Sequence, residues 1–90
     1  MDVSATYFSQ HMGRVLQHVL SGQTVTVTRY NSQVAVLEPV DEQAEAGATP
    51  VSSTELFQNL GGYLDRVVSG EQFIITRHGR PIALMHDFIE

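Results

Sequence analysis

The chain has 90 residues, 42% of them hydrophobic, and its five Lys and Arg residues against ten Asp and Glu residues give a formal net charge of −5. A chain of this length buries only about 60–65% of its unfolded surface, so its core is thin and favours pairing of two units. The negative charge argues against a broad basic surface that holds nucleic acid by charge alone. All five basic residues are arginines, whose planar, forked donors suit a few focused contacts.

The sequence contains no cysteine, so disulfide bonds, thiolate metal sites and a cysteine nucleophile are excluded together. Residues 1–8 lack the basic stretch and apolar run of a secretion signal. No stretch approaches the roughly 18 apolar residues that a membrane helix needs. We therefore expect a cytoplasmic protein without membrane contact.

An internal repeat with a period of 48 residues organises the chain. Residues 3–40 align with residues 51–88 without a gap, and both copies carry the same apolar helical stripe. We therefore expect a first repeat at 1–40, an acidic linker at 41–50, typical of a flexible tether, and a second repeat at 51–90. The identical pairs are Val3/Val51, Ser4/Ser52, Thr6/Thr54, Gln10/Gln58, Gly13/Gly61, Leu16/Leu64, Val19/Val67, Ser21/Ser69, Gly22/Gly70, Thr28/Thr76, Arg29/Arg77 and Ala35/Ala83.

The first repeat begins with a short strand, Val3–Ala5, followed by a helix that either Ser4 or Thr6 caps. The helix ends at Gly22, which can adopt the left-handed conformation of a C′ residue. Gly13 inside the helix predicts either a break into two shorter helices or a close approach. The second repeat has the same pattern, including a capping box of Ser52 and Glu55. In the second repeat the strand is Val51–Ser53, the candidate caps are Ser52 and Thr54, the helix ends at Gly70, and the internal glycine is Gly61.

Two strands follow each helix. Residues 24–28 and 72–76 alternate between two faces, as strands do. In the turn after each of them, Asn31 stands opposite Gly79, and both residue types tolerate a positive φ in a hairpin. The returning strands are Val34–Leu37 and Ile82–Met85.

Each repeat is therefore predicted to be a β-α-β-β unit, and the fold class is α+β. A unit of this size is too small to close a core alone, so the two units are expected to pair through their sheets. The expected product is an intramolecular pseudo-dimer with a shared antiparallel sheet, helices on one face and a pseudo-twofold axis. Further homo-oligomerisation of such chains stays open.

The second repeat carries several short motifs in a fixed order. They are Val-Ser-Ser-Thr-Glu at 51–55, Gln-Asn-Leu at 58–60, Asp-Arg-Val at 65–67, Gly-Glu at 70–71 and Ile-Thr-Arg-His-Gly-Arg-Pro-Ile-Ala-Leu-Met at 75–85. In this order they resemble the N-terminal domain of the Phd/YefM (prevent-host-death) antitoxins. The first repeat keeps the pattern more loosely, so the resemblance covers nearly the whole chain outside the linker.

The resemblance implies a domain that dimerises through its sheet to bind operator DNA, an inverted repeat, before a C-terminal segment that wraps and inhibits a cognate toxin. Here one chain supplies both halves of the dimer. Family members often carry a DNA-contacting basic residue before the Gln-Asn pair, where this chain has Phe57 and, in the first repeat, Ser9. The chain also ends at Glu90 without the toxin-wrapping segment, which was lost, was trimmed, or never served this protein.

The arginines are the candidates for contacts with a phosphate backbone. Arg29 and Arg77 hold equivalent places close to the two turns, so they would meet DNA symmetrically. The alternative is that each pairs with an acid or a carbonyl at its strand end. Arg80 has no arginine counterpart, so its contact would be one-sided, or it is a solvated turn charge. Arg14 and Arg66 are expected on the polar sides of their helices, in solvent.

Four polar residues near the helix starts complete the predicted DNA-binding site. Thr6 and Thr54 offer hydroxyl and backbone N–H groups that can hold a phosphate oxygen, although capping explains them equally well. Gln10 and Gln58 match across the repeats and either read a base edge or bond locally.

The four histidines form no predicted site, because none of them is repeated and no carboxylate lies at ligand spacing. We expect them on the surface and expect no metal or other cofactor. No nucleophile elbow, P-loop or HExxH motif occurs, so the chain is not expected to be an enzyme.

Two hypotheses about function follow. The first is an antitoxin of a type II toxin–antitoxin system that acts as a DNA-binding transcriptional autoregulator, a repressor. The alternative is a protein-binding module that neutralises a toxin or another partner without binding DNA. The pair of Arg29 and Arg77 favours the first hypothesis. The negative charge and the missing basic residue in the first helix favour the second.

Overall fold

The computed structural model describes residues 1–40 and 47–88, so most of the linker expected at 41–50 lies outside the described residues. We call residues 1–40 the N-terminal half and residues 47–88 the C-terminal half. Each half has the order strand, helix, helix, strand, strand. The elements are β1 (Asp2–Ser4), α1 (Ala5–Gln10), α2 (Met12–Leu20), β2 (Val25–Arg29), β3 (Ser32–Glu38), β4 (Thr49–Ser52), α3 (Ser53–Gln58), α4 (Leu60–Val68), β5 (Phe73–Arg77) and β6 (Arg80–Asp87).

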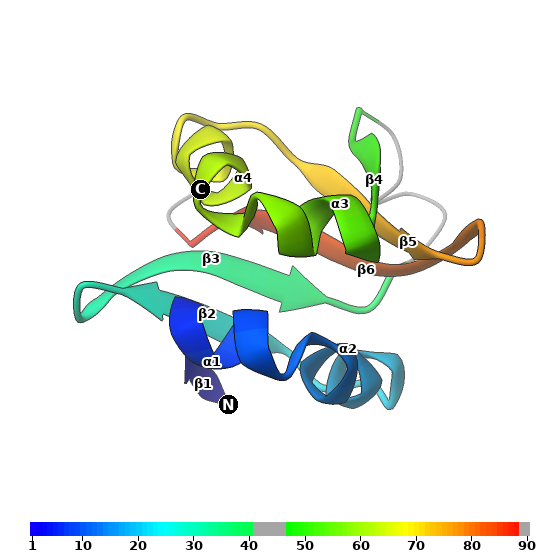
Figure 1. The fold of residues 1–90 in the computed structure, drawn as a ribbon, viewed down its shortest axis with the longest axis horizontal. Coiled ribbons are helices and arrows are strands. Elements are labelled where there is room, and N and C mark those ends of the chain that lie inside the picture. Colours follow the sequence, from blue (N-terminus) through cyan, green and yellow to red (C-terminus); the bar gives the residue numbers. More distant parts are fainter. Residues whose placement is uncertain (41–46, 89–90) are drawn as a thin grey trace.

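The fold is α+β. The strands of both halves form one six-stranded sheet in the order β1-β2-β3-β6-β5-β4, and Figure 1 shows the helices on its near face. The two hairpins and the central pair of β3 and β6 are antiparallel. However, β1 runs parallel to β2 and β4 runs parallel to β5, so the prediction of an antiparallel sheet is wrong at both edges. The helices between these strands form crossovers, and a crossover returns the chain in its original direction.

Each predicted helix is broken into two, as one of the two readings of the internal glycines expects. The break lies at His11 and at Asn59, two residues before the glycines, where φ is −130° and −148°. A close approach also occurs, but at Gly62. A Cβ atom on Gly62 would lie 2.5 Å from Nδ2 of Asn59. Glycine therefore lets the first turn of α4 lie against the side chain at the break.

Local interactions at the helix ends and hairpins match the sequence closely. Ser4 and Ser52 are the N-caps, and Ser52 forms the predicted capping box with Glu55. Gly22 and Gly70 have φ values of 103° and 109°, as expected for C′ residues. Both hairpin turns have two central residues with positive φ, the type I′ geometry that suits the strand twist. These turn residues are Tyr30, Asn31, His78 and Gly79.

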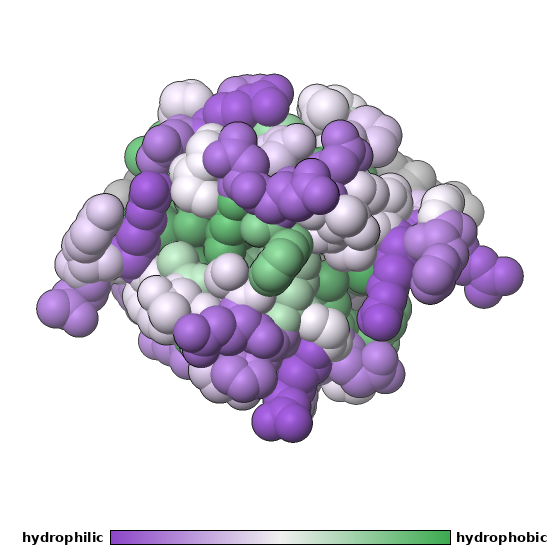
Figure 2. Space-filling model, in the orientation of Figure 1, coloured by the Kyte–Doolittle hydropathy of each residue, from purple (hydrophilic) through white to green (hydrophobic). Residues whose placement is uncertain are grey.

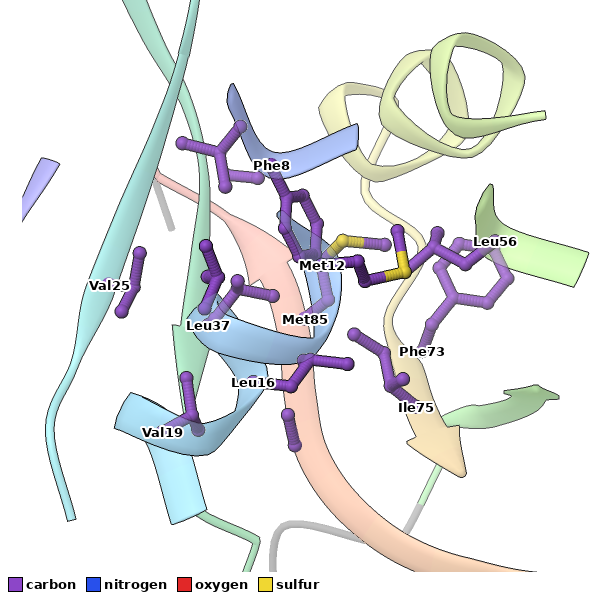
Figure 3. Packing of buried hydrophobic residues seen from close by; sticks show 14 of the residues in the cluster. Phe8, Met12, Leu16, Val19, Val25, Leu37, Leu56, Phe73, Ile75 and Met85 are labelled. Carbon is purple, nitrogen blue, oxygen red and sulfur yellow. The ribbon is translucent and has the colours of Figure 1, made fainter. Parts of the chain in front are cut away.

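The hydrophobic core is shared by the two halves. Helix α2 packs on β6 as well as on β2, and α4 packs on β3 as well as on β6. At the centre of the sheet Leu37 of β3 faces Met85 of β6, and both side chains are fully buried (Figure 3). The largest fully buried side chains are Phe8, Phe73, Leu16, Leu37, Leu56, Leu64, Ile75, Met85, Val15, Val19, Val25 and Val27. Each half therefore completes the core of the other.

Candidate functional site

Two hollows open where the helices of the two halves meet. The first hollow has a volume of about 440 Å³ and is lined by Ala5, Thr6, Ser9, Gln10, Arg29, Gln58, Asn59, Leu60, Gly61 and Leu64. The second hollow has a volume of about 240 Å³ and is lined by Met12, Gly13, Leu16, Ser53, Thr54, Phe57 and Arg77. Figure 2 shows that the face carrying the helices has apolar side chains near its centre, with polar side chains around them.

The two hollows are equivalent under the 48-residue repeat. Every residue that lines the second hollow has a counterpart 48 positions away that lines the first. Phe57 takes the place of Ser9 and is 56% exposed, and its ring occupies space that the serine leaves open. This larger apolar side chain contributes to the smaller volume of the second hollow, whose lining also contains no glutamine or asparagine.

Six of the seven predicted site residues line these hollows, and the seventh lies beside one of them. Arg29, Thr6, Gln10 and Gln58 line the first hollow, and Thr54 and Arg77 line the second. Arg80 is the cross-strand partner of Arg77 at the end of the hairpin, so the two side chains leave the sheet on the same side. The structure therefore gathers the predicted residues into two places related by the repeat.

The environment of Arg29 is the strand-end ion pair that we considered as the alternative to a DNA contact. Its Nη1 donates a hydrogen bond of 2.7 Å to Oδ1 of Asp65 on α4, in the other half of the chain. The guanidinium also lies 5.6 Å from the centre of the Tyr30 ring. The hydrogen bond to Asp65 raises the pKa of Arg29 above its ordinary value, against a smaller opposing effect of desolvation. Arg29 is thus half-buried and its charge is balanced.

Arg77 has none of these partners. The counterparts of Asp65 and Tyr30 are Gln17 and His78. Within residues 1–40 and 47–88, no carboxylate pairs with Arg77, whose side chain is exposed. Two residues that look equivalent in the sequence therefore differ in their electrostatics.

A third hollow lies beside the second and was not foreseen from the sequence. It has a volume of about 450 Å³ and is lined by Gly13, Arg14, Gln17, His18, Ser21 and Arg77. Arg14 was expected to be a solvated charge of the helix surface, because a helical pattern alone does not say which strand end lies beside it. One feature of the sequence could have indicated this hollow: the counterpart of Asp65 in the first repeat is Gln17, which carries no charge to balance an arginine.

Arg66, like Arg29, forms an ion pair. Its Nε and Nη2 donate hydrogen bonds of 2.9 Å and 2.8 Å to the two carboxylate oxygens of Glu71, and the guanidinium lies 4.9 Å from the centre of the Phe73 ring. The hydrogen bonds from Arg66 lower the pKa of Glu71 below its ordinary value. The prediction that Arg66 is simply solvated is corrected to an exposed ion pair.

The four polar residues of the predicted site are available for a ligand. Thr6 and Thr54 are exposed in the first turns of α1 and α3 and are not the N-caps, because Ser4 and Ser52 hold that position. Gln10 and Gln58 are exposed at the ends of α1 and α3.

One histidine departs from the expected surface position. His86 is only 7% exposed, and its Nε2 lies 3.2 Å from Oε2 of Glu38. It faces Val36 across the central strands, on the side of the sheet opposite to Ala83 and Met85. No group of three metal-ligating side chains is found among the described residues.

None of the helices in the described ranges is long and apolar enough to cross a membrane. Comparison of the chain with family models, with curated proteins and with solved structures gives no match. The arrangement of the described residues therefore carries the functional argument. It can offer guanidinium and hydroxyl donors to an anionic ligand at two equivalent places, and side-chain amide donors at the first of them.

Proposed function

We propose that the chain is a Phd/YefM-like antitoxin that acts as a DNA-binding transcriptional autoregulator, built as an intramolecular pseudo-dimer. The observation that carries the proposal is the equivalence of the two hollows. Each one places a strand-end arginine beside the threonine of a helix start, Arg29 with Thr6 and Arg77 with Thr54. Such a repeated set of donors suits the two halves of an inverted repeat.

The sheet supports the pseudo-dimer. The strand order β1-β2-β3-β6-β5-β4 reads the same from both edges when each strand is replaced by its counterpart in the other half. Leu37 and Met85 are separated by the repeat period and face each other at the central seam. A twofold axis through this seam would relate the two hollows.

The charge distribution of the protein limits how it holds DNA. With a net charge of −5, few phosphates can be neutralised, so the salt dependence should be shallow. Each phosphate contact contributes about −0.9 to the slope of log K against log salt concentration for duplex DNA. Base contacts from Gln10 and Gln58 would supply sequence preference, because an amide can bond two atoms of a base edge.

The test measures binding of the purified chain to a labelled duplex from the region upstream of its own gene. We expect specific binding with a shallow salt slope, and an affinity loss of at least about tenfold in the double variant Arg29→Ala/Arg77→Ala. Arg66→Ala is the control for the loss of an arginine, because Glu71 engages Arg66 and Arg66 does not line either hollow. Absence of a sequence-specific complex at low salt would contradict the proposal.

Exposed apolar side chains support a second candidate, a module that neutralises a toxin without DNA. Phe57 at the edge of the second hollow and Leu20 and Val68 near the helix ends are about half-exposed. Phe57→Ser, which copies Ser9 of the other half, should weaken binding to the product of a neighbouring toxin gene by about tenfold, as loss of an aromatic anchor does. Calorimetry with that product measures the effect, with Ser9→Ala as the control. Unchanged affinity in Phe57→Ser would remove this candidate site.

A further inference from the structure

The two strand-end arginines are surrounded by residues of opposite electrostatic character. In the C-terminal half, Asp65 pairs with Arg29 and Glu71 pairs with Arg66, so each of these guanidinium groups is balanced by an acid. At the equivalent positions the N-terminal half has two glutamines. These are Gln17, opposite Asp65, and Gln23, opposite Glu71. The carboxylate that neutralises Arg29 is therefore missing beside Arg77, where Gln17 stands in its place.

The third hollow adds positive charge at this same place. Arg14 and Arg77 line it together with His18, and no carboxylate belongs to its lining. Neither arginine makes an ion pair within the described part of the chain. The counterpart of Arg14 is Gly62, so the C-terminal half has no second arginine beside Arg29.

Two guanidinium groups that share one hollow repel each other, and an anion between them removes the repulsion. Arg80, the cross-strand partner of Arg77, adds a third positive charge at the same end of the sheet. Guanidinium groups bind phosphate oxygens through charge-assisted, often bidentate hydrogen bonds. Three of the five arginines thus gather at one end of a molecule whose net charge is negative.

We propose that the phosphodiester backbone of DNA binds at the third hollow, between Arg14 and Arg77, and that Asp65 closes the equivalent place at Arg29. The chain then engages one half-site strongly and the other weakly. This inference rests on the proposed DNA-binding function and specifies which end of the pseudo-dimer supplies the main contact. Asp65 acts as a specificity-determining residue, because its ion pair with Arg29 prevents that arginine from contacting the second half-site.

Exchanging the residues at equivalent positions provides the test, with the same upstream duplex as the probe. Asp65→Gln gives the C-terminal half the glutamine of the N-terminal half and releases Arg29. The salt slope should become steeper by about 0.9 and the affinity should rise several-fold, as one added phosphate contact predicts. Gln17→Asp gives Arg77 the partner that Arg29 has, and it should lower the affinity by about tenfold. Gln72→Asp controls for the added negative charge, because Gln72 is exposed and lies just before β5, at the end of the strand away from Arg77.

Single arginine variants locate the contact. In the unmodified chain, Arg77→Ala and Arg14→Ala should each reduce the affinity more than Arg29→Ala does. In the Asp65→Gln background, the loss from Arg29→Ala should become larger than in the unmodified chain and approach the loss from Arg77→Ala. Circular dichroism of each variant establishes that it is folded.

The outcomes separate this inference from the proposed function. Equal losses from Arg29→Ala and Arg77→Ala in the unmodified chain would overturn the one-sided contact and leave symmetric operator binding intact. A Gln17→Asp variant that binds as well as Gln72→Asp would also overturn it. If the unmodified chain forms no complex with the duplex, the proposed function itself fails.

Discussion

Replacing Leu37 with Ala is expected to lower the free energy of unfolding by about 2–5 kcal/mol, the range for a fully buried leucine. Leu37 is 0% exposed and lies at the central seam, where it faces Met85 and where the core of both halves meets. The cavity that the truncation leaves cannot easily be filled by movement of the strand, because β3 is paired on both sides, with β2 and with β6. A domain of this size is stable by only about 5–15 kcal/mol, so one truncation removes a large fraction of that stability.

Leu20→Ala is the matched control for this change. Leu20 is 49% exposed at the end of α2, so the same truncation there should change the free energy of unfolding by less than about 0.5 kcal/mol. Urea denaturation followed by circular dichroism measures both variants. The melting temperature of Leu37→Ala should fall by about 4–8 °C for each kcal/mol lost. Similar values for the two variants would contradict the role of the seam in the shared core.

Periodicity and turn chemistry were sufficient to predict most of the fold. The apolar stripe of each helix predicted most of the buried positions, but its last members, Leu20 and Val68, are about half-exposed. The glycines after the helices marked the left-handed turns. Parallel pairing at the sheet edges was missed, although a strand that leads through a helix into its neighbour requires it. The helix break was placed at Gly13 and Gly61 instead of His11 and Asn59, because low helix propensity points to glycine first.

The candidate site was harder to predict, because it depends on contacts between the halves. The repeat identified Arg29 and Arg77 as a pair, and the structure places them in equivalent hollows. The repeat could not reveal that Asp65 contacts Arg29 across the interface of the two halves, whereas Gln17 lies beside Arg77. These are partners from distant parts of the sequence. A comparison of identical positions passes over them, because the informative positions are those where the repeats differ.

Cutting the chain between residues 40 and 47 tests the shared core most directly. Helix α2 of the N-terminal half packs on β6, and α4 of the C-terminal half packs on β3, so each fragment would expose the strand and helix surfaces that the other covers. Fragments of this size also lack the buried area for independent folding. Each purified fragment should therefore be largely unfolded at micromolar concentration, and mixing the two should restore the circular dichroism spectrum.

The reassembled complex should also be less stable than the intact chain and should depend on concentration. A short covalent connection holds its two ends at an effective concentration on the order of millimolar, about a thousandfold above micromolar fragments, which corresponds to about 4 kcal/mol. Urea denaturation over a range of fragment concentrations measures this difference, and the uncut chain with the same inserted protease site is the control. A fragment that folds as a monomer by light scattering would show that a half closes its own core. That result would contradict a core that the two halves must complete for each other.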